Sequence, residues 1–98
     1  MTVIKVSDSF IEVSGHSGYG TEGNDIVCAA ISTLSEATYN YLIATKNKVF
    51  LEEKSGYYKI IFLKLNKAGI GIKNEFISMV DDLESQYSNY IRRNKWKN

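Results

Sequence analysis

Two side chains of this sequence stand out as able to do chemistry: its single cysteine, Cys28, and its single histidine, His16. A cysteine nucleophile needs a base nearby, because a free thiol at neutral pH is only a few per cent thiolate. Histidine is the side chain best suited to accept a proton in that pH range. The pair therefore predicts nucleophilic thiol chemistry, and an inert buried cysteine beside a solvated histidine is the structural alternative.

The segment between these two residues is rich in glycine, with four of the seven glycines in residues 15–23. Such a backbone suits positive φ angles or a close approach to another group. We expect a loop that orders around a substrate, formed by Gly15, Gly18, Tyr19, Gly20 and Gly23. A tight connector between two elements is the alternative.

An amphipathic helix is predicted from Asn24 to about residues 46–47, because apolar residues recur there at three- and four-residue spacing. Asn24 or Asp25 would cap this helix, with Asp25 favoured because it stands three residues before Cys28. Cys28 then falls in the first turn, where free amides and the helix dipole favour an anion such as a thiolate. His16 lies where the preceding strand enters the loop, so the loop can bring both side chains together.

The remaining pattern predicts two β-hairpins, one over residues 3–13 and one over residues 49–65. A second helical stripe runs from Phe76 to Ile91. Residues 67–72 are ambiguous between a strand extension and a loop, and residues 92–98 read as a basic, frayed tail. The order β-β-α-β-β-α predicts one α+β domain over residues 1–98, with two helices and a mainly antiparallel four-stranded sheet.

Composition excludes several classes of protein. The 98 residues are 44% hydrophobic and 23% charged, with a net charge of +1, which is typical of a small globular domain without a nucleic-acid footprint. One Cys and one His fall short of a structural zinc site, so we expect no metal and no cofactor. No apolar run has the length of a membrane span or a signal-peptide core, which favours a cytoplasmic protein.

Residues 15–32, GHSGYGTEGNDIVCAAIS, resemble the signature of the ribosomal-processing cysteine proteases of the Prp family. That signature is Gly-His-Ala, a glycine-bearing spacer, and Gly-x-Asp-Ile-Val-Cys-Ala-Ala-Val-Ser. The resemblance covers nearly the whole chain. It departs from the family at Ser17, where alanine is usual, and at Ser88, where proline is common.

The resemblance implies a homodimeric endopeptidase that removes the N-terminal extension of the large-subunit ribosomal protein L twenty-seven. Cys28 would be the nucleophile and His16 the general base, with Asp25 and Ser32 as supporting residues. Backbone amides at the helix start, that of Cys28 among them, would stabilise the oxyanion. Asp25 would act either as the helix cap or as a partner of His16.

Two other functions compete with this interpretation. Residues 18–23 match GxGxxG, but dinucleotide binding needs a parallel βαβ unit, and hairpins on both sides argue against it. A non-catalytic ribosome- or RNA-binding module would use the basic tail around Trp96, although the near-zero net charge makes direct nucleic-acid binding unexpected. Four tyrosines could line a dimer face, a peptide groove or the edge of the core, and the sequence does not decide among these: Tyr57, Tyr58, Tyr87 and Tyr90.

Overall fold

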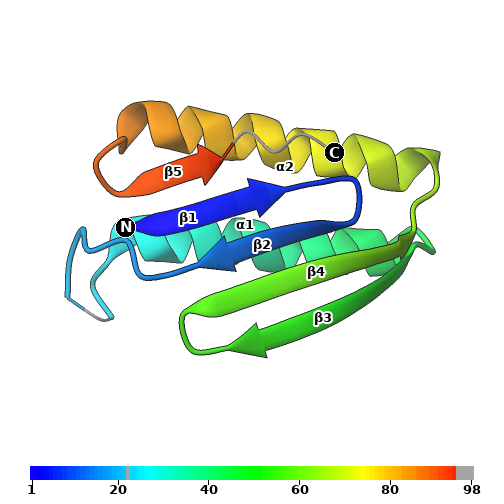
Figure 1. The fold of residues 1–98 in the computed structure, drawn as a ribbon, viewed down its shortest axis with the longest axis horizontal. Helices are drawn as coiled ribbons and strands as arrows, with labels where there is room; N and C mark the ends of the chain where they lie inside the picture. The colour runs from blue at the N-terminus through cyan, green and yellow to red at the C-terminus, as the bar shows by residue number, and fades with distance from the viewer. Residues whose placement is uncertain (22, 95–98) are drawn as a thin grey trace.

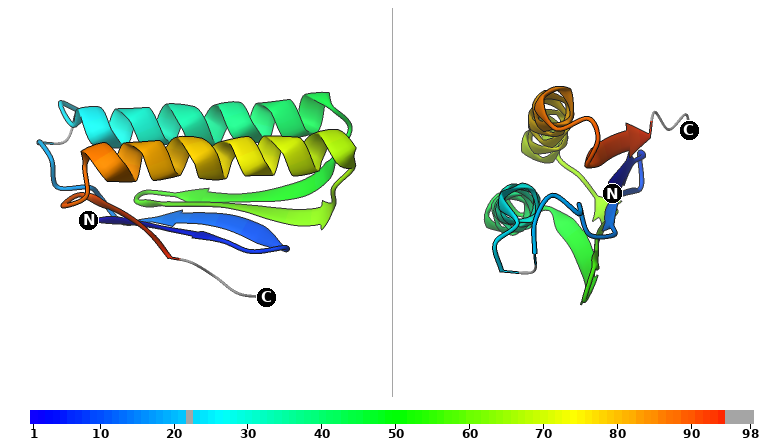
Figure 2. Two further views of the ribbon diagram at one scale, coloured as in Figure 1. Left: turned by 90° about the horizontal axis from the view of Figure 1, so that it is seen from above. Right: turned by 90° about the vertical axis from the view of Figure 1, so that its left-hand side faces the viewer.

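Two helices cover one face of a five-stranded sheet (Figures 1 and 2). The computed structural model describes residues 1–21 and 23–94. Its elements are β1 (Thr2–Val6), β2 (Phe10–Ser14), α1 (Ile26–Ala44), β3 (Lys48–Lys54), β4 (Tyr57–Lys64), α2 (Lys67–Gln86) and β5 (Ile91–Asn94). Within these ranges, no helix combines the length and apolar character needed to cross a membrane.

The strands lie in the order β3-β4-β2-β1-β5. Both predicted hairpins are present, β1 with β2 and β3 with β4, and β4 also pairs antiparallel with β2. The last strand, β5, pairs parallel with β1. The α+β class with two helices is confirmed, whereas the expected four-stranded sheet is wrong: the sheet has five strands and is mixed.

The fifth strand occupies a segment that was expected to be partly helix end and partly frayed tail. Ile91 is 1% exposed and belongs to the core. The Arg93 guanidinium donates to both carboxylate oxygens of Asp81 on α2, at 2.6 and 2.9 Å, and its backbone N–H donates to Glu84 at 2.9 Å. These tertiary contacts define a strand that carries too few apolar residues to show alternation. The remaining tail, residues 95–98, lies outside the described residues.

Residues 67–72, ambiguous in the sequence, form the start of α2. The Asn66 side chain caps this helix by accepting a hydrogen bond from the Gly69 backbone N–H at 2.9 Å. Gly69 and Gly71 weaken the helical pattern, because glycine is a poor helix former. A Cβ at Gly69 would collide with the Asn47 side chain, so the close approach of these two segments requires glycine there.

The two helices run antiparallel and side by side, and the core lies between them and the sheet (Figure 2). Buried residues of β1 and β2 alternate with residues that point to the other face, as the strand pleat requires, and Ile60 is the buried residue of β4. The buried hydrophobic residues are Ile4, Val6, Ile11, Val13, Val27, Ile31, Leu42, Ile60, Phe76, Val80 and Ile91. This packing fixes α1 over the β3–β4 hairpin, which positions the site described next.

Candidate active site

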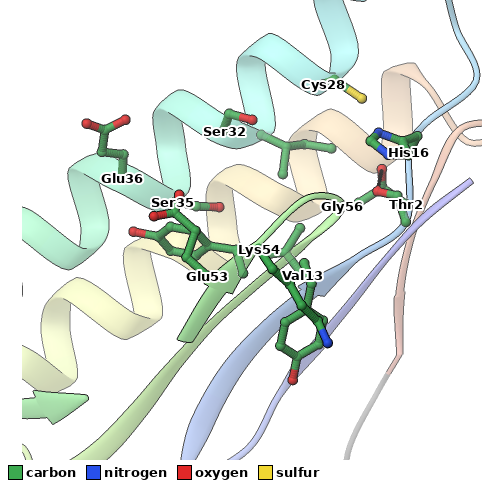
Figure 3. A pocket seen from close by; sticks show the side chains of 14 residues that line it. Thr2, Val13, His16, Cys28, Ser32, Ser35, Glu36, Glu53, Lys54 and Gly56 are labelled. Carbon is green, nitrogen blue, oxygen red and sulfur yellow. Dashed lines mark hydrogen bonds between the residues drawn. The ribbon is translucent and has the colours of Figure 1, made fainter. Parts of the chain in front are cut away.

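Cys28 lies in the first turn of α1, as predicted. Asp25 is the N-cap of the helix, and its Oδ1 accepts a hydrogen bond from the Cys28 backbone N–H at 2.9 Å. The Cys28 side chain is half-buried and carries a free thiol. In Figure 3 its sulfur points toward the side on which His16 lies.

The second carboxylate oxygen of Asp25 ties the glycine-rich loop to the helix. It accepts hydrogen bonds from the Ser17 hydroxyl at 2.6 Å and from the Gly20 backbone N–H at 3.2 Å. The Ser17 hydroxyl, aided by the amides of Cys28 and Gly20, holds the pKa of Asp25 well below its ordinary value of 3.8. Within the described part of the chain, no hydrogen bond or ion pair joins Asp25 to His16. The structure therefore supports the cap and not the His16 partner.

Replacing Asp25 with serine is expected to lower the Tm by several degrees at pH 7, because Ser17 and Gly20 lose their shared acceptor. The folded-state pKa of Asp25 is depressed, so its contribution to stability is present above about pH 4 and is lost as the pH falls through the folded pKa. Thermal unfolding of Asp25→Ser should therefore depend less on pH than that of the wild type between about pH 4 and pH 2. Parallel pH profiles for the two proteins would contradict this linkage.

Ser17 forms two hydrogen bonds with the Cys28 sulfur, and sequence reasoning gave it no role. Its backbone N–H donates to Sγ at 3.3 Å, and the thiol donates to its hydroxyl oxygen at 3.5 Å. The same oxygen accepts from the Tyr19 backbone N–H at 3.2 Å. Ser17 is only 2% exposed, although a serine in a glycine-rich loop reads as a surface residue. Its departure from the usual alanine was the only feature that singled it out.

His16 lies at the start of the loop, beside the tip of the β3–β4 hairpin. The Gly15 backbone N–H donates to the Gly56 carbonyl at 2.8 Å, which fixes the end of β2 against that tip. Figure 3 shows His16 and Cys28 at the same end of the group of side chains drawn, and both residues line the cavity shown there. The hydrogen bonds of the described residues include none between them. The structure thus brings the two predicted residues to one site with an exposed imidazole and a half-buried thiol.

Gly56 lies at the hairpin tip, close against the His16 ring. Its φ is +71°, and a Cβ added there would stand 3.1 Å from His16 Nε2. The ring would have to shift by a few tenths of an ångström, so we expect Gly56→Ala to lower kcat/KM by less than the roughly hundredfold that a 1 Å misplacement costs, and the positive φ should destabilise the fold by roughly 1 kcal/mol.

Gly71→Ala is the matched control for this substitution, because the site is helical and, among the described residues, the added Cβ would meet no atom within 4 Å beyond its own turn of helix. It should leave peptide cleavage unchanged and should not destabilise the fold. Peptide cleavage assays and thermal unfolding compare the two variants. Full activity of Gly56→Ala would show that Gly56 does not position His16.

Two cavities meet at the cysteine. One, of about 200 Å³, lies between α1 and the β3–β4 hairpin, and the other, of about 330 Å³, lies beside the glycine-rich loop. His16, Cys28 and Ser32 line both. The predicted loop glycines are divided between them, with Gly15 in the first and the other three in the second: Gly18, Gly20 and Gly23. An extended chain laid across Cys28 would thus have a cavity on either side of the sulfur.

Tyr19, also predicted as part of the substrate loop, does not line either of these cavities. Its ring stacks edge-to-face on Tyr87 and Tyr90, with ring centroids 5.6 and 5.1 Å apart. It therefore anchors the loop to the segment between α2 and β5. The other tyrosine pair, Tyr57 and Tyr58, lines the first cavity.

The structure gives little support to the two competing functions. The strand before the glycine-rich loop, β2, has antiparallel neighbours on both sides, so the loop does not belong to a dinucleotide-binding βαβ unit. Of the basic tail, Arg93 is paired with Asp81, and Trp96 lies outside the described residues. Over residues 1–21 and 23–94, no group of three or more His, Cys, Asp or Glu side chains could hold a metal ion.

Comparisons with known proteins bear on the family and on the fold. A family model described as "Cysteine protease Prp" matches residues 2–92. A search of curated proteins found no match.

Three solved structures show the same fold. The chain is 24% identical, with a TM-score of 0.84 and 95% of each chain covered, to the essential ribosomal processing protease Prp from S. aureus with a covalently linked product peptide. It is 23% identical, with a TM-score of 0.80 and 95% of each chain covered, to that S. aureus protease with a substrate peptide. Against SMU.848 from Streptococcus mutans the identity is 24% and the TM-score 0.70, with 94% of this chain and 89% of that chain covered.

Proposed function

The chain belongs to the cysteine protease Prp family, and we propose that it removes the N-terminal extension of the large-subunit ribosomal protein L twenty-seven in the cytoplasm. The observation that carries this proposal is the position of the Cys28 sulfur, which lies where two cavities meet and on the side that His16 faces. An endopeptidase must bind substrate on both sides of the bond it cuts. The two cavities offer room for both sides.

The chemistry follows from the two proposed catalytic residues. His16 accepts the proton of the Cys28 thiol, and the sulfur attacks the carbonyl carbon of the scissile peptide bond. The carbon–nitrogen bond then breaks as the His16 imidazolium gives its proton to the leaving amine. Water, activated by His16, hydrolyses the thioester, which releases the extension as a free acid and restores the thiol.

The tetrahedral intermediate needs a hydrogen-bond donor for its oxyanion. The Cys28 backbone N–H was expected to serve, but it already donates to Asp25. The Ser17 backbone N–H is the donor that lies against the sulfur, at 3.3 Å, and we assign it the oxyanion contact. Donors of this kind are worth roughly 3 kcal/mol in the transition state when preorganised.

The two supporting residues have different proposed roles. Asp25 positions Cys28 through the helix cap and positions Ser17 through the 2.6 Å hydrogen bond to its hydroxyl. Ser32 lies one helical turn beyond Cys28, is exposed, and lines both cavities. We assign its hydroxyl a contact with the substrate backbone.

The proposal is tested with the precursor ribosomal protein that carries its extension. Incubation with the purified protein should release the extension, and mass spectrometry of both products should locate one cut at the junction. A precursor with a scrambled junction is the matched control and should stay intact. An uncut precursor, or cuts at scattered positions, would overturn the assignment.

The homodimer implied by the family stays a proposal. On the sheet face that the helices leave uncovered, Phe10 and Phe50 flank Ile61 across neighbouring strands, and Leu63 on the same strand as Ile61 is 68% exposed. A second copy of the chain would bury this apolar row. Light scattering should give twice the chain mass of 11.1 kDa, and a mass of one chain would exclude the dimer.

A further inference from the structure

The first cavity extends away from Cys28 and His16 to an end whose side chains the proposed chemistry does not use. Ser35 and Glu36 of α1, Glu53 of β3 and Tyr58 of β4 line this end of the cavity. In Figure 3 Ser35 and Glu53 are drawn next to each other, and the Glu36 carboxylate extends outward from the same stretch of helix. We call these four residues the acidic end of the cavity. Its two carboxylates come from opposite walls, one from the helix and one from the hairpin.

A buried hydroxyl without a partner marks this end. Ser35 is 2% exposed, and its Oγ is a buried side-chain oxygen without a hydrogen-bond partner among the described residues. Buried polar atoms are normally hydrogen-bonded, and an unpaired one destabilises the fold. Ser35 lines the cavity, so the missing partner points to a group that enters from outside the chain.

The two carboxylates also lack partners within the chain. Glu36 and Glu53 are exposed, and in residues 1–21 and 23–94 they form no hydrogen bond and no ion pair, which leaves both carboxylates open to a cation from solution. The neighbouring Lys54 ammonium lies 5.3 Å above the centre of the Tyr57 ring. Burial, followed by the charges of Glu53 and Glu36, raises the pKa of Tyr58 to about 12, so both negative charges act on the phenol at this end.

We propose that the acidic end is a subsite for a basic side chain of the peptide substrate, an inference that rests on the proposed peptidase function. Lys and Arg side chains carry several hydrogen-bond donors and no acceptor, which suits two carboxylates and two hydroxyls. Glu36 follows Cys28 by eight residues along α1, or about 12 Å. An extended peptide advances about 3.3 Å per residue, so the basic residue lies three or four positions from the cleaved bond.

The test measures peptide binding, so that it does not depend on turnover. The probes are fluorescein-labelled peptides that span the junction of extension and mature protein. Each peptide carries either Lys or Glu at the third and fourth positions from the cleaved bond. Separate peptides carry these residues before the bond and after it. Anisotropy titrations use the Cys28→Ala protein and the same protein with Glu36→Gln and Glu53→Gln added. Glu52→Gln is the matched control, because the Glu52 side chain points to the other face of the same strand.

On one side of the bond, the Lys peptide should bind about fivefold more tightly than the Glu peptide, as expected for exposed ion pairs. The preference should vanish with Glu36→Gln and Glu53→Gln and persist with Glu52→Gln. Equal affinities, no binding, or a preference that survives the double substitution would overturn the subsite. Peptides that bind with this preference but are not cut by the active protein would instead overturn the proposed function alone.

Discussion

Replacing Cys28 with alanine is expected to abolish release of the extension, with a loss in kcat/KM of at least about a thousandfold. This sequence contains no second cysteine that could take over as nucleophile. The fold should persist, because the helix cap uses the backbone N–H of residue 28 and not its side chain. Cleavage is followed by mass spectrometry and folding by thermal unfolding.

Thr33→Ala on the exposed surface of the same helix is the matched control for this loss. It should cleave like the wild type, since Thr33 does not line either of the two cavities at Cys28. Cleavage that continues undiminished in Cys28→Ala would rule out Cys28 as the nucleophile. Loss of both cleavage and folding would instead assign Cys28 a structural role.

The second large effect is expected from His16→Gln, which should lower kcat/KM by about 10² to 10⁴, the usual contribution of a general acid–base. This sequence contains no other histidine. The variant should also react more slowly with iodoacetamide at neutral pH, because the Cys28 thiol loses the base that takes its proton.

Binding separates this catalytic role from a structural one. In the Cys28→Ala background, His16→Gln should leave the affinity for the junction peptide within about twofold, since His16 is exposed and its proposed role is proton transfer. A large loss of affinity, with little change in the rate of iodoacetamide reaction, would make His16 a substrate-binding residue and not the base.

The parts of the fold with strong local patterns were predicted from the sequence. Both hairpins and α1 follow from alternation and three-to-four spacing, and the Asp25 cap follows from its position before Cys28. The start of α2 was missed because Gly69 and Gly71 lower its helix propensity. At Gly69 the close approach of Asn47 requires glycine. β5 was missed because parallel pairing with β1 and the Arg93–Asp81 contact decide its structure.

The site shows the same division between local and distant contacts. Cys28, His16 and Asp25 belong to one segment, so their spacing on a loop and a helix start could be interpreted directly. Gly56 comes from a hairpin far along the chain, and only the folded sheet places it against His16. Ser17 lies within the segment, but its burial against the sulfur depends on how the loop closes.

The pairing of β1 with β5 has a consequence for folding kinetics. It joins Thr2 with Ile91, close to the two ends of this sequence, and such distant contacts carry a high loop-closure entropy and slow folding. Thr2 also lines the first cavity and donates a hydrogen bond from its hydroxyl to the Gly15 carbonyl at 3.1 Å, directly before His16. A chain that had formed α1 but not this ladder would possess the thiol without a finished cavity. Peptidase activity should therefore recover during refolding no faster than β1 pairs with β5.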